Sequence, residues 1–261
     1  AQAREVLDRN LPGVFSLQEY QRFYPAGEVA SHLVGFTNID DVGQEGIELA
    51  YENWLRGTPG AKQVMKDRRG RTIEEVRLIN SARPGKDLAL SIDLRLQYMA
   101  YRALKEAVTR HNAVGGSVVI LDVETGEVLA MVNQPSFNPN NRRNLTAAAV
   151  RNRAMTDLFE PGSAVKPLSI LAALESGKYG PHTKIDTHPG HVRVPGMIFY
   201  DIGNYGMLDV TGVITKSSNV GTTKIVMDLD PNDVHGLFFR MGLGQSTGSG
   251  FPGEAAGDLP N

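Results

Sequence analysis

Residues 88–132 read LALSIDLRLQYMAYRALKEAVTRHNAVGGSVVILDVETGEVLAMV, and this stretch decides the fold. Its middle carries apolar residues at helical spacing. Asp93 precedes them and is of a type that commonly caps helix N-termini, so we predict one amphipathic helix over residues 93–110. Two runs rich in β-branched residues follow, residues 117–123 and 127–132, and the Glu-Thr-Gly segment between them is typical of a hairpin. A helix followed by antiparallel strands predicts α+β architecture.

The sequence on either side of this stretch differs in character. Residues 1–90 are rich in glycine and charge, with short apolar runs between turn signals, which predicts an irregular, strand-containing domain. A Pro-Gly turn signal at residues 84–85 marks the end of this domain, and we expect residues 88–92 to form a strand that begins the next one. From Ala147 onward helical patterns dominate, so a mainly helical lobe is expected to follow the sheet. We therefore predict two domains, residues 1–90 and 91–261.

The composition excludes several classes of function. The chain has 261 residues, of which 41% are hydrophobic, and it can bury a substantial core. Its 27 basic and 29 acidic residues are spread without a basic block that would follow a phosphate backbone, so we expect no nucleic-acid partner. The lack of cysteine excludes disulfides and thiolate chemistry. Three histidines between residues 182 and 191 have no defined ligand geometry, so we expect no metal and no cofactor.

A nucleophile and its base can be found in the stretch FEPGSAVKP, residues 159–167. Ser163 follows a Pro-Gly turn at the predicted start of a helix, for which Gly177 is a plausible C-terminal stop. Residues three apart on a helix are neighbours, so the Lys166 amine can reach the Ser163 hydroxyl. Pro167 has no N–H to donate to the Ser163 carbonyl, so we expect an irregular first turn. Most Ser-x-x-Lys pairs are a helix cap and a solvated lysine, so this pair alone does not establish a site.

A second element supports a catalytic interpretation. Lys216-Ser217-Ser218-Asn219 lies between a helix-like stretch and a predicted helix over residues 219–229, where a hydroxyl and a carboxamide could converge on a cleft. Ser136-Phe137-Asn138 has the same Ser-x-Asn spacing, but turn chemistry explains that copy better. A Ser-x-x-Lys motif followed by a triplet with serine and asparagine is the signature of the penicillin-recognising serine enzymes.

The extended motifs, together with GEVLA at residues 126–130 and PSFNPNN at residues 135–141, resemble the class B penicillin-binding proteins of the division-specific, penicillin-binding protein 3 type. Residues 22–27, 43–48 and 55–57 look like the non-catalytic, dimerisation-like pedestal of that family, so the resemblance spans nearly the whole chain. It implies a β-lactamase/transpeptidase-like domain with an antiparallel sheet and a helical lobe.

The resemblance also implies an activity and a location. The family's enzymes are anchored at the periplasmic face of the bacterial inner membrane, where they join peptidoglycan stem peptides during septum formation. β-Lactam antibiotics are their suicide substrates, and other cell-division membrane proteins are expected partners. By resemblance Ser163 attacks the D-Ala-D-Ala carbonyl and Lys166 takes its proton. Ser217 relays a proton to the leaving amine, and Asn219 holds the peptide backbone of the substrate.

One part of the family pattern is missing. The family carries a Lys-Thr-Gly or Lys-Ser-Gly triplet on a core strand, which supplies an oxyanion donor and a cation for the substrate carboxylate. Neither triplet occurs between Ala1 and Asn261, and the N-terminal membrane anchor is not found there either. We therefore expect a transpeptidase domain that is incomplete at its C-terminus and inactive by itself.

Two other functions remain open at this point. A penicillin-recognising hydrolase, either a β-lactamase or a D,D-carboxypeptidase, would share Ser163 and Lys166 but would need a base that activates water, and the sequence does not show that base. A non-catalytic scaffold or β-lactam sensor would keep the fold for binding division partners, and the missing triplet is compatible with it.

Overall fold

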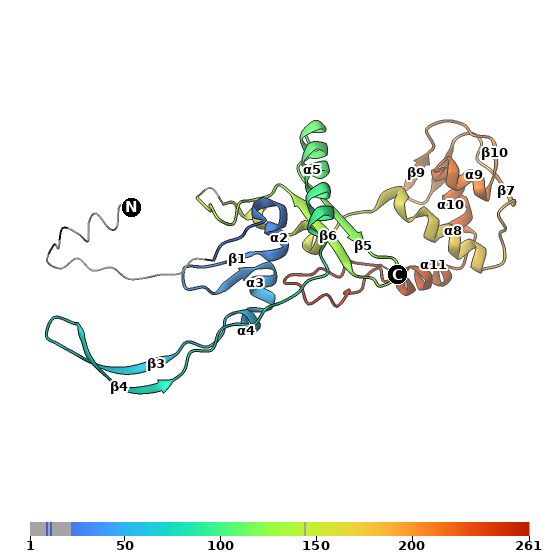
Figure 1. The fold of residues 1–261 in the computed structure, drawn as a ribbon. Helices are drawn as coiled ribbons and strands as arrows, with labels where there is room; N and C mark the ends of the chain where they lie inside the picture. Colours follow the sequence, from blue (N-terminus) through green and yellow to red (C-terminus); the bar gives the residue numbers. More distant parts are fainter. Residues whose placement is uncertain (1–8, 10, 12–21, 144, 261) are drawn as a thin grey trace. The chain divides into compact units, whose positions relative to one another are not determined.

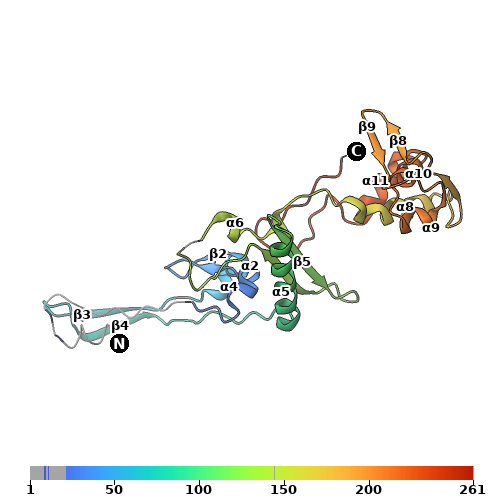
Figure 2. The same ribbon diagram turned by 90° about the horizontal axis from the view of Figure 1, so that it is seen from above.

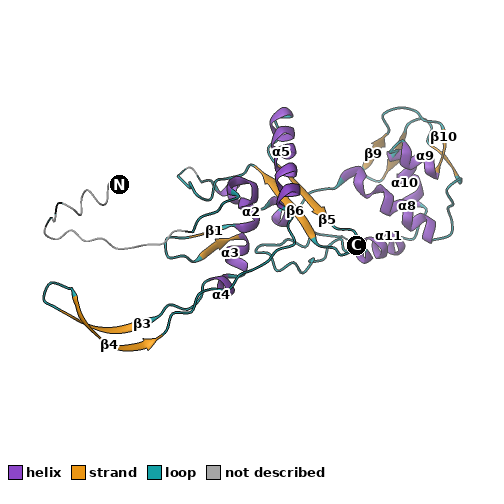
Figure 3. Ribbon diagram, viewed as in Figure 1, coloured by secondary structure: helices purple, strands orange, loops and turns teal. Residues whose placement is uncertain are grey.

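The computed structural model describes Arg9, Leu11, residues 22–143 and residues 145–260. The chain forms two compact units, one that runs to Thr156 and includes Gly250–Gly253, and one that comprises Asp157–Ser249 and the residues from Glu254 onward. Helices and short antiparallel strand pairs make up both units, which confirms the predicted α+β class (Figures 1 and 3). Within the described residues, no helix combines the length and apolar character needed to span a lipid bilayer.

The elements follow the chain in a simple order. The first unit contains η1 (Gly27–Ala30), α2 (Ser31–Val34), β1 (Phe36–Thr37), β2 (Gly43–Glu45), α3 (Gly46–Ala50), α4 (Glu52–Leu55), β3 (Ala61–Lys66), β4 (Thr72–Asn80), α5 (Leu94–Arg110), β5 (Gly116–Leu121), β6 (Val128–Gln134), α6 (Ala147–Val150) and α7 (Arg153–Thr156). The second contains η2 (Gly162–Val165), α8 (Lys166–Glu175), β7 (Lys184–Asp186), β8 (His191–Val194), β9 (Met197–Tyr200), β10 (Met207–Asp209), α9 (Val210–Thr215), α10 (Asn219–Met227) and α11 (Pro231–Arg240).

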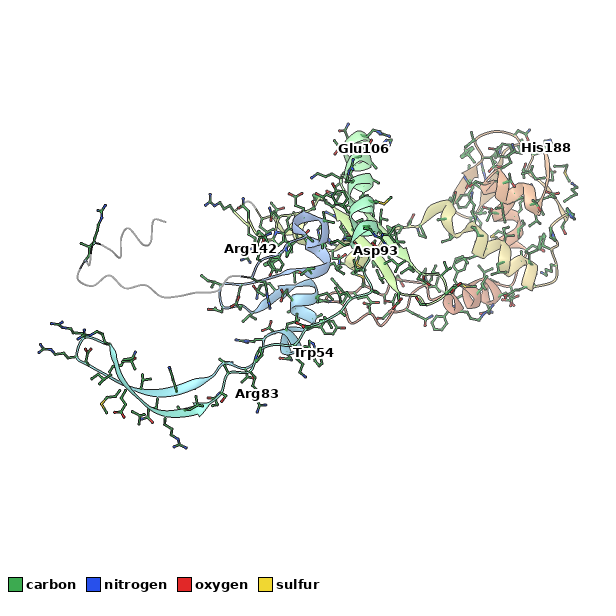
Figure 4. All side chains as sticks on the ribbon, in the orientation of Figure 1. Trp54, Arg83, Asp93, Glu106, Arg142 and His188 are labelled. Carbon is green, nitrogen blue, oxygen red and sulfur yellow. The ribbon has the colours of Figure 1, made fainter. Side chains whose placement is uncertain are left out.

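The predicted amphipathic helix is α5, which packs on the hairpin formed by β5 and β6. Asp93 is its N-cap, and its carboxylate accepts hydrogen bonds from the backbone N–H groups of Arg95 and Leu96, as expected for a capping side chain (Figure 4). A hydrogen bond from the Arg95 side chain is the largest cause of a lowered Asp93 pKa, and together with the two backbone bonds it brings this pKa to about 2. The predicted strands are also confirmed, although the first ends at Leu121 because the Asp122 side chain already accepts the N–H groups of the turn.

The predicted strand over residues 88–92 is wrong. This segment runs beside the start of β6, but it makes only isolated contacts with it, from Ser91 Oγ to the Val128 carbonyl and from the Asp93 N–H to the Leu129 carbonyl. A β-strand needs a repeating ladder of backbone bonds, and these two contacts do not form one. The apolar alternation that suggested a strand therefore belongs to an extended connection.

A single buried glutamine on α5 joins the N-terminal segment to the sheet. The Gln97 side chain is fully buried, and its Nε2 donates to the carbonyls of Val29 and Met131, each at 2.8 Å. Its Oε1 accepts the Met131 N–H, also at 2.8 Å. The buried amide therefore has partners for its polar atoms, as burial of polar groups requires, and it bonds three backbone groups in return.

The PSFNPNN turn makes further contacts with the N-terminal segment. The Asn140 side chain accepts the Tyr24 N–H and donates to the Tyr24 carbonyl, both at 2.9 Å. Phe137 is buried and meets the rings of His32 and Phe36 edge-on. Because of such contacts the first compact unit extends well beyond residue 90 and includes β5 and β6. The predicted division into residues 1–90 and 91–261 stays a prediction.

The β3–β4 hairpin extends away from the short helices of the same unit (Figures 1 and 2). Asp67 organises its tip by accepting the N–H groups of Arg69 and Arg71 and by pairing with the Arg71 guanidinium. These bonds lower the pKa of the Asp67 carboxyl, with the Arg71 backbone bond the largest cause.

The helical lobe expected after the sheet corresponds to the second unit, although the short helices α6 and α7 belong to the first. The core of the second unit is formed by apolar side chains from α8, α9, α10, α11 and the strand β7, among them Ile170, Val213, Ile225 and Leu237, all almost fully buried. Two antiparallel pairs, β7 with β10 and β8 with β9, lie beside these helices. The core holds the ends of α8, α9 and α10 in place, and the candidate site is built on those ends.

Candidate active site

Ser163 lies in a 3₁₀ turn that leads directly into α8. The turn η2 begins at Gly162, whose φ of +60° favours glycine, and the Lys166 N–H donates to the Ser163 carbonyl. This i to i+3 bond replaces the α-helical bond that Pro167 cannot make, so the predicted irregular first turn is confirmed with its expected cause. Side chains three apart are nearly eclipsed in a 3₁₀ helix, so Ser163 and Lys166 share one face. The helix ends near Gly177, as predicted, where φ is +71°.

The Lys166 ammonium is the centre of the candidate site. Its Nζ donates to Asn219 Oδ1 at 2.7 Å, to the Ser217 carbonyl at 2.5 Å and to Ser217 Oγ at 3.2 Å. Three of the four predicted site residues are thus joined by direct side-chain hydrogen bonds. Ser163 is linked to them through the backbone of η2, and its side chain is exposed.

Ser217 occupies a position that normally favours glycine. Its φ is +51°, in the left-handed region. The Ser217 N–H donates to the Ile214 carbonyl and the Ser218 N–H to the Val213 carbonyl, the pair of bonds that defines a Schellman motif at the end of α9. This motif turns the chain sharply, and it presents both the carbonyl and the hydroxyl of Ser217 to Lys166.

Asn219 is held on two sides. Its Nδ2 donates to the Tyr200 carbonyl at 2.7 Å, and its backbone N–H donates to Asp201 Oδ1 at 2.5 Å. The remaining polar atom, Oδ1, accepts from Lys166. The end of β9 therefore fixes the direction in which the side-chain oxygen of Asn219, Oδ1, points. The predicted role of Asn219 in binding the substrate backbone stays a prediction.

The environment of Lys166 favours its neutral form more than water does. Burial lowers the Lys166 pKa because it disfavours the charged amine, and the negative charge of Asp201 opposes this shift without cancelling it. An amine must be neutral to accept a proton from a serine hydroxyl. The site therefore combines a serine, a lysine with a lowered pKa and a second hydroxyl, the set of groups needed for acyl transfer.

Sequence analysis missed two contributors to this site. Tyr200 ends β9 and Asp201 follows it, and both lie 17 to 19 residues before Ser218 and Asn219, so no motif spacing connects them with the Ser-x-Asn triplet. The lone signal was an acidic residue at the end of a short β-rich run, which is too common to predict a role. Away from the site, and within the part of the chain that the structure describes, no group of three His, Asp or Glu side chains could hold a metal ion.

The comparisons with known proteins agree with this geometry. Residues 116–261 match the penicillin binding protein transpeptidase domain, and residues 2–90 match the penicillin-binding protein dimerisation domain. The chain belongs to the penicillin-binding protein transpeptidase family. The two matches confirm the resemblance found in the sequence, with the pedestal before the transpeptidase region.

The relatives of this penicillin-binding protein include curated cell-wall enzymes. Peptidoglycan D,D-transpeptidase FtsI of Escherichia coli K12 is 45% identical over 250 residues, which are 96% of this chain and 42% of FtsI. The probable peptidoglycan D,D-transpeptidase PbpC of Pseudomonas aeruginosa is 41% identical over 259 residues, which are 99% of this chain and 46% of PbpC. The chain thus spans less than half the length of these relatives.

A solved structure shares the fold. Penicillin-binding protein 3 from Mycobacterium tuberculosis, crystallised in complex with ampicillin, matches with a TM-score of 0.79 at 32% identity. The match covers 92% of this chain and 50% of that protein. It extends over both the pedestal and the transpeptidase region.

Proposed function

We propose that this protein is a serine-type D,D-transpeptidase that cross-links peptidoglycan stem peptides during septal cell-wall synthesis. The observation that carries the proposal is the hydrogen-bonded cluster of Lys166, Ser217 and Asn219 one helical turn from an exposed serine. The names of the relatives, peptidoglycan D,D-transpeptidases, support the same substrate class.

In the proposed mechanism Ser163 is the nucleophile. Its Oγ attacks the carbonyl of the penultimate D-Ala while the neutral Lys166 amine accepts the hydroxyl proton. Lys166 also bonds to Ser217 Oγ at 3.2 Å, so a proton can pass from the lysine through Ser217 to the leaving amine of the terminal D-Ala. An acyl-enzyme on Ser163 results, and the amine of a second stem peptide then attacks it to form the cross-link.

The electrostatics of the turn favour this chemistry. The Ser163 N–H lies at the N-terminal end of η2 and α8, where backbone N–H groups face developing negative charge. Asn219 orients the amine of Lys166, and we propose that it also contacts the peptide backbone of the substrate. In this proposal residues 1–90 form the pedestal and residues 91–261 belong to the transpeptidase domain.

Further parts of the proposal concern ligands, partners and location. β-Lactams acylate Ser163 because their strained amide carbonyl takes the place of the D-Ala-D-Ala bond, and a relative was crystallised with ampicillin. The protein acts at the periplasmic face of the bacterial inner membrane, held by a membrane anchor in the whole protein. Its partners there are other membrane proteins of cell division.

Labelling with a fluorescent penicillin tests the proposal. In the intact gene product, Ser163→Ala should abolish covalent labelling while the fold is retained, since only the attacking oxygen is lost. Ser176→Ala is the matched control, because Ser176 lies at the end of the same helix and its hydroxyl bonds close by in the chain, donating to the Ala173 carbonyl and accepting the Lys178 N–H. Undiminished labelling of the Ser163 variant would show that the nucleophile is wrongly assigned.

The same label separates transfer from hydrolysis. A transpeptidase should release bound penicillin slowly, because no positioned base activates water against its acyl-enzyme. Rapid release with turnover of free penicillin would instead assign a penicillin-recognising hydrolase. A protein that never becomes labelled, with Ser163 intact and the fold retained, would be a non-catalytic scaffold.

A further inference from the structure

We propose that Asp201 is a positioning residue of this site, which holds the first turn of α10 so that Ser217 and Asn219 meet Lys166. The inference rests on the proposed function and extends it to a residue outside the two sequence motifs. Asp201 lies directly after β9, and its carboxylate points at the N-terminus of α10.

Three donors converge on the Asp201 carboxylate. Its Oδ1 accepts the backbone N–H groups of Asn219 at 2.5 Å and Val220 at 3.1 Å, and its Oδ2 accepts the Ser218 hydroxyl at 2.7 Å. The first N–H groups of a helix have no partner within the helix. The Asp201 carboxylate accepts two of these N–H groups from outside the helix. The position of the helix end therefore depends on the end of β9 and not only on α10 itself.

Ser218 makes the arrangement more rigid. Its side chain is fully buried and is the N-cap of α10, since Ser218 Oγ accepts the Gly221 N–H at 2.8 Å. The same hydroxyl donates its own hydrogen to Asp201, so this oxygen is both a donor and an acceptor. Ser218 and Asp201 together complete the capping of the helix, and Ser218 is the chain neighbour of both motif residues.

The consequence for the site is geometric. Tyr200 and Asp201 hold the Nδ2 and the backbone N–H of Asn219, which leaves its Oδ1 directed at Lys166 Nζ, 2.7 Å away. If the Asp201 carboxylate lost its hold, the helix end could shift and Asn219 would no longer orient the lysine. Misplacing a catalytic group by about 1 Å can cost about a hundredfold in rate.

Asp201 also acts on Lys166 through its charge. Its negative charge raises the Lys166 pKa, against the larger lowering caused by burial. Tyr200 on β9, Lys216 at the end of α9 and Lys224 on α10 are titratable side chains on the segments beside Lys166. None of the three contributes to the shift of the Lys166 pKa, so a change of charge at Asp201 has a distinct pH signature.

The test compares Asp201→Asn with Asp201→Glu in the intact gene product, using the acylation rate by fluorescent penicillin as a function of pH. Asp209→Asn is the matched control, because Asp209 is the N-cap of α9 in the same unit and accepts the Gly212 N–H. We expect both Asp201 variants to acylate about tenfold to a hundredfold more slowly. The rise of the rate with pH should move to lower pH in Asp201→Asn only, since the glutamate keeps the charge.

Each outcome decides the question. An unshifted pH profile in Asp201→Asn, or rates within twofold of wild type in both variants, would overturn the proposal, as would an equal loss in Asp209→Asn. If Asp201→Asn does not fold, slow acylation by a folded Asp201→Glu with an unshifted profile supports it and a normal rate overturns it. Failure here is distinct from failure of the proposed function, which is decided by the labelling of Ser163→Ala.

Discussion

The carbonyl oxygen of Ser217 lies 2.5 Å from Lys166 Nζ, and Ser217 reaches it in a left-handed backbone conformation with φ of +51°. A non-glycine residue in this region costs about 1 to 2 kcal/mol relative to an ordinary conformation. The surrounding Schellman motif and the buried start of α10 keep the residue there. Strain of this kind is often retained at functional sites, and it gives Ser217 a testable signature.

Ser217→Gly should separate stability from activity. Glycine relieves the left-handed strain but adds freedom to the unfolded chain, so we expect a net gain of up to about 1 kcal/mol, or roughly 2 to 4 °C in Tm. Ser217→Ala keeps the strain and should not raise Tm. Both variants lose the hydroxyl, so both should acylate and transfer more slowly.

The control for this pair is the second Ser-x-Asn copy in the sequence. Ser136→Ala should leave the acylation rate unchanged, because Ser136 contacts the Tyr101 hydroxyl in the first unit and no atom of the Lys166 cluster. A Ser217→Gly variant that is less stable than Ser217→Ala would contradict the strain argument. Normal transfer by both variants would remove Ser217 from the mechanism.

Much of this architecture was predictable because local signals determine it. The cap at Asp93 and the apolar spacing predict α5, and Pro167 predicts the irregular turn before α8. These features involve residues within four positions of one another, so periodicity and turn chemistry are sufficient to find them. The segment over residues 88–92 has strand-like alternation, but a strand depends on a partner ladder, which sequence alone does not supply.

The roles of Gln97 and Asp201 could not be predicted, because the groups that they bond lie far from them in the sequence. Gln97 on an amphipathic helix looks like a surface residue, and its burial follows only from the backbone groups of Val29 and Met131 that surround it. Asp201 acts on a helix that begins 18 residues later in the chain. The motif residues were found because their chemistry is rare in combination, whereas the side chains that position them are of common types.

Lys166→Met should slow acylation by about 10² to 10⁴, the usual contribution of general-base assistance. The loss should appear in the rate of covalent labelling and not in the thermal stability of the fold. Lys166→Arg should not restore the rate, because a guanidinium stays protonated and cannot accept the serine proton. An arginine variant that acylates normally would show that Lys166 only organises Ser217 and Asn219.

The acylation rate of the wild-type protein should depend on pH through Lys166. The reactive form is the neutral amine, so the rate rises with pH and levels off above the Lys166 pKa. Burial lowers that pKa, so the midpoint of the rise should lie below pH ~10.4, the ordinary value for lysine. The measurement is second-order labelling by fluorescent penicillin across the pH range in which the fold is stable. A rate that keeps rising to the ordinary lysine pKa would contradict the lowered value, and the rise should vanish in the residual reaction of Lys166→Met.

Gln97→Met should destabilise the first unit without changing the chemistry. Methionine has a similar volume but cannot bond the carbonyls of Val29 and Met131 or the Met131 N–H, all of which Gln97 contacts at 2.8 Å. Leaving buried backbone groups without partners costs about 1 to 3 kcal/mol each, so we expect a loss of roughly 2 to 5 kcal/mol in the free energy of unfolding.

Arg102→Met, on an exposed position of the same helix, is the control and should change stability little. Chemical denaturation followed by circular dichroism measures the first effect, and fluorescent-penicillin labelling in the absence of denaturant should stay near the wild-type rate, because the Lys166 cluster lies in the other unit. If Gln97→Met proves as stable as Arg102→Met, the three hydrogen bonds of the buried amide contribute nothing net, and the connection between α5, η1 and β6 must depend on the apolar contacts of Tyr101, Val29 and Val132 instead.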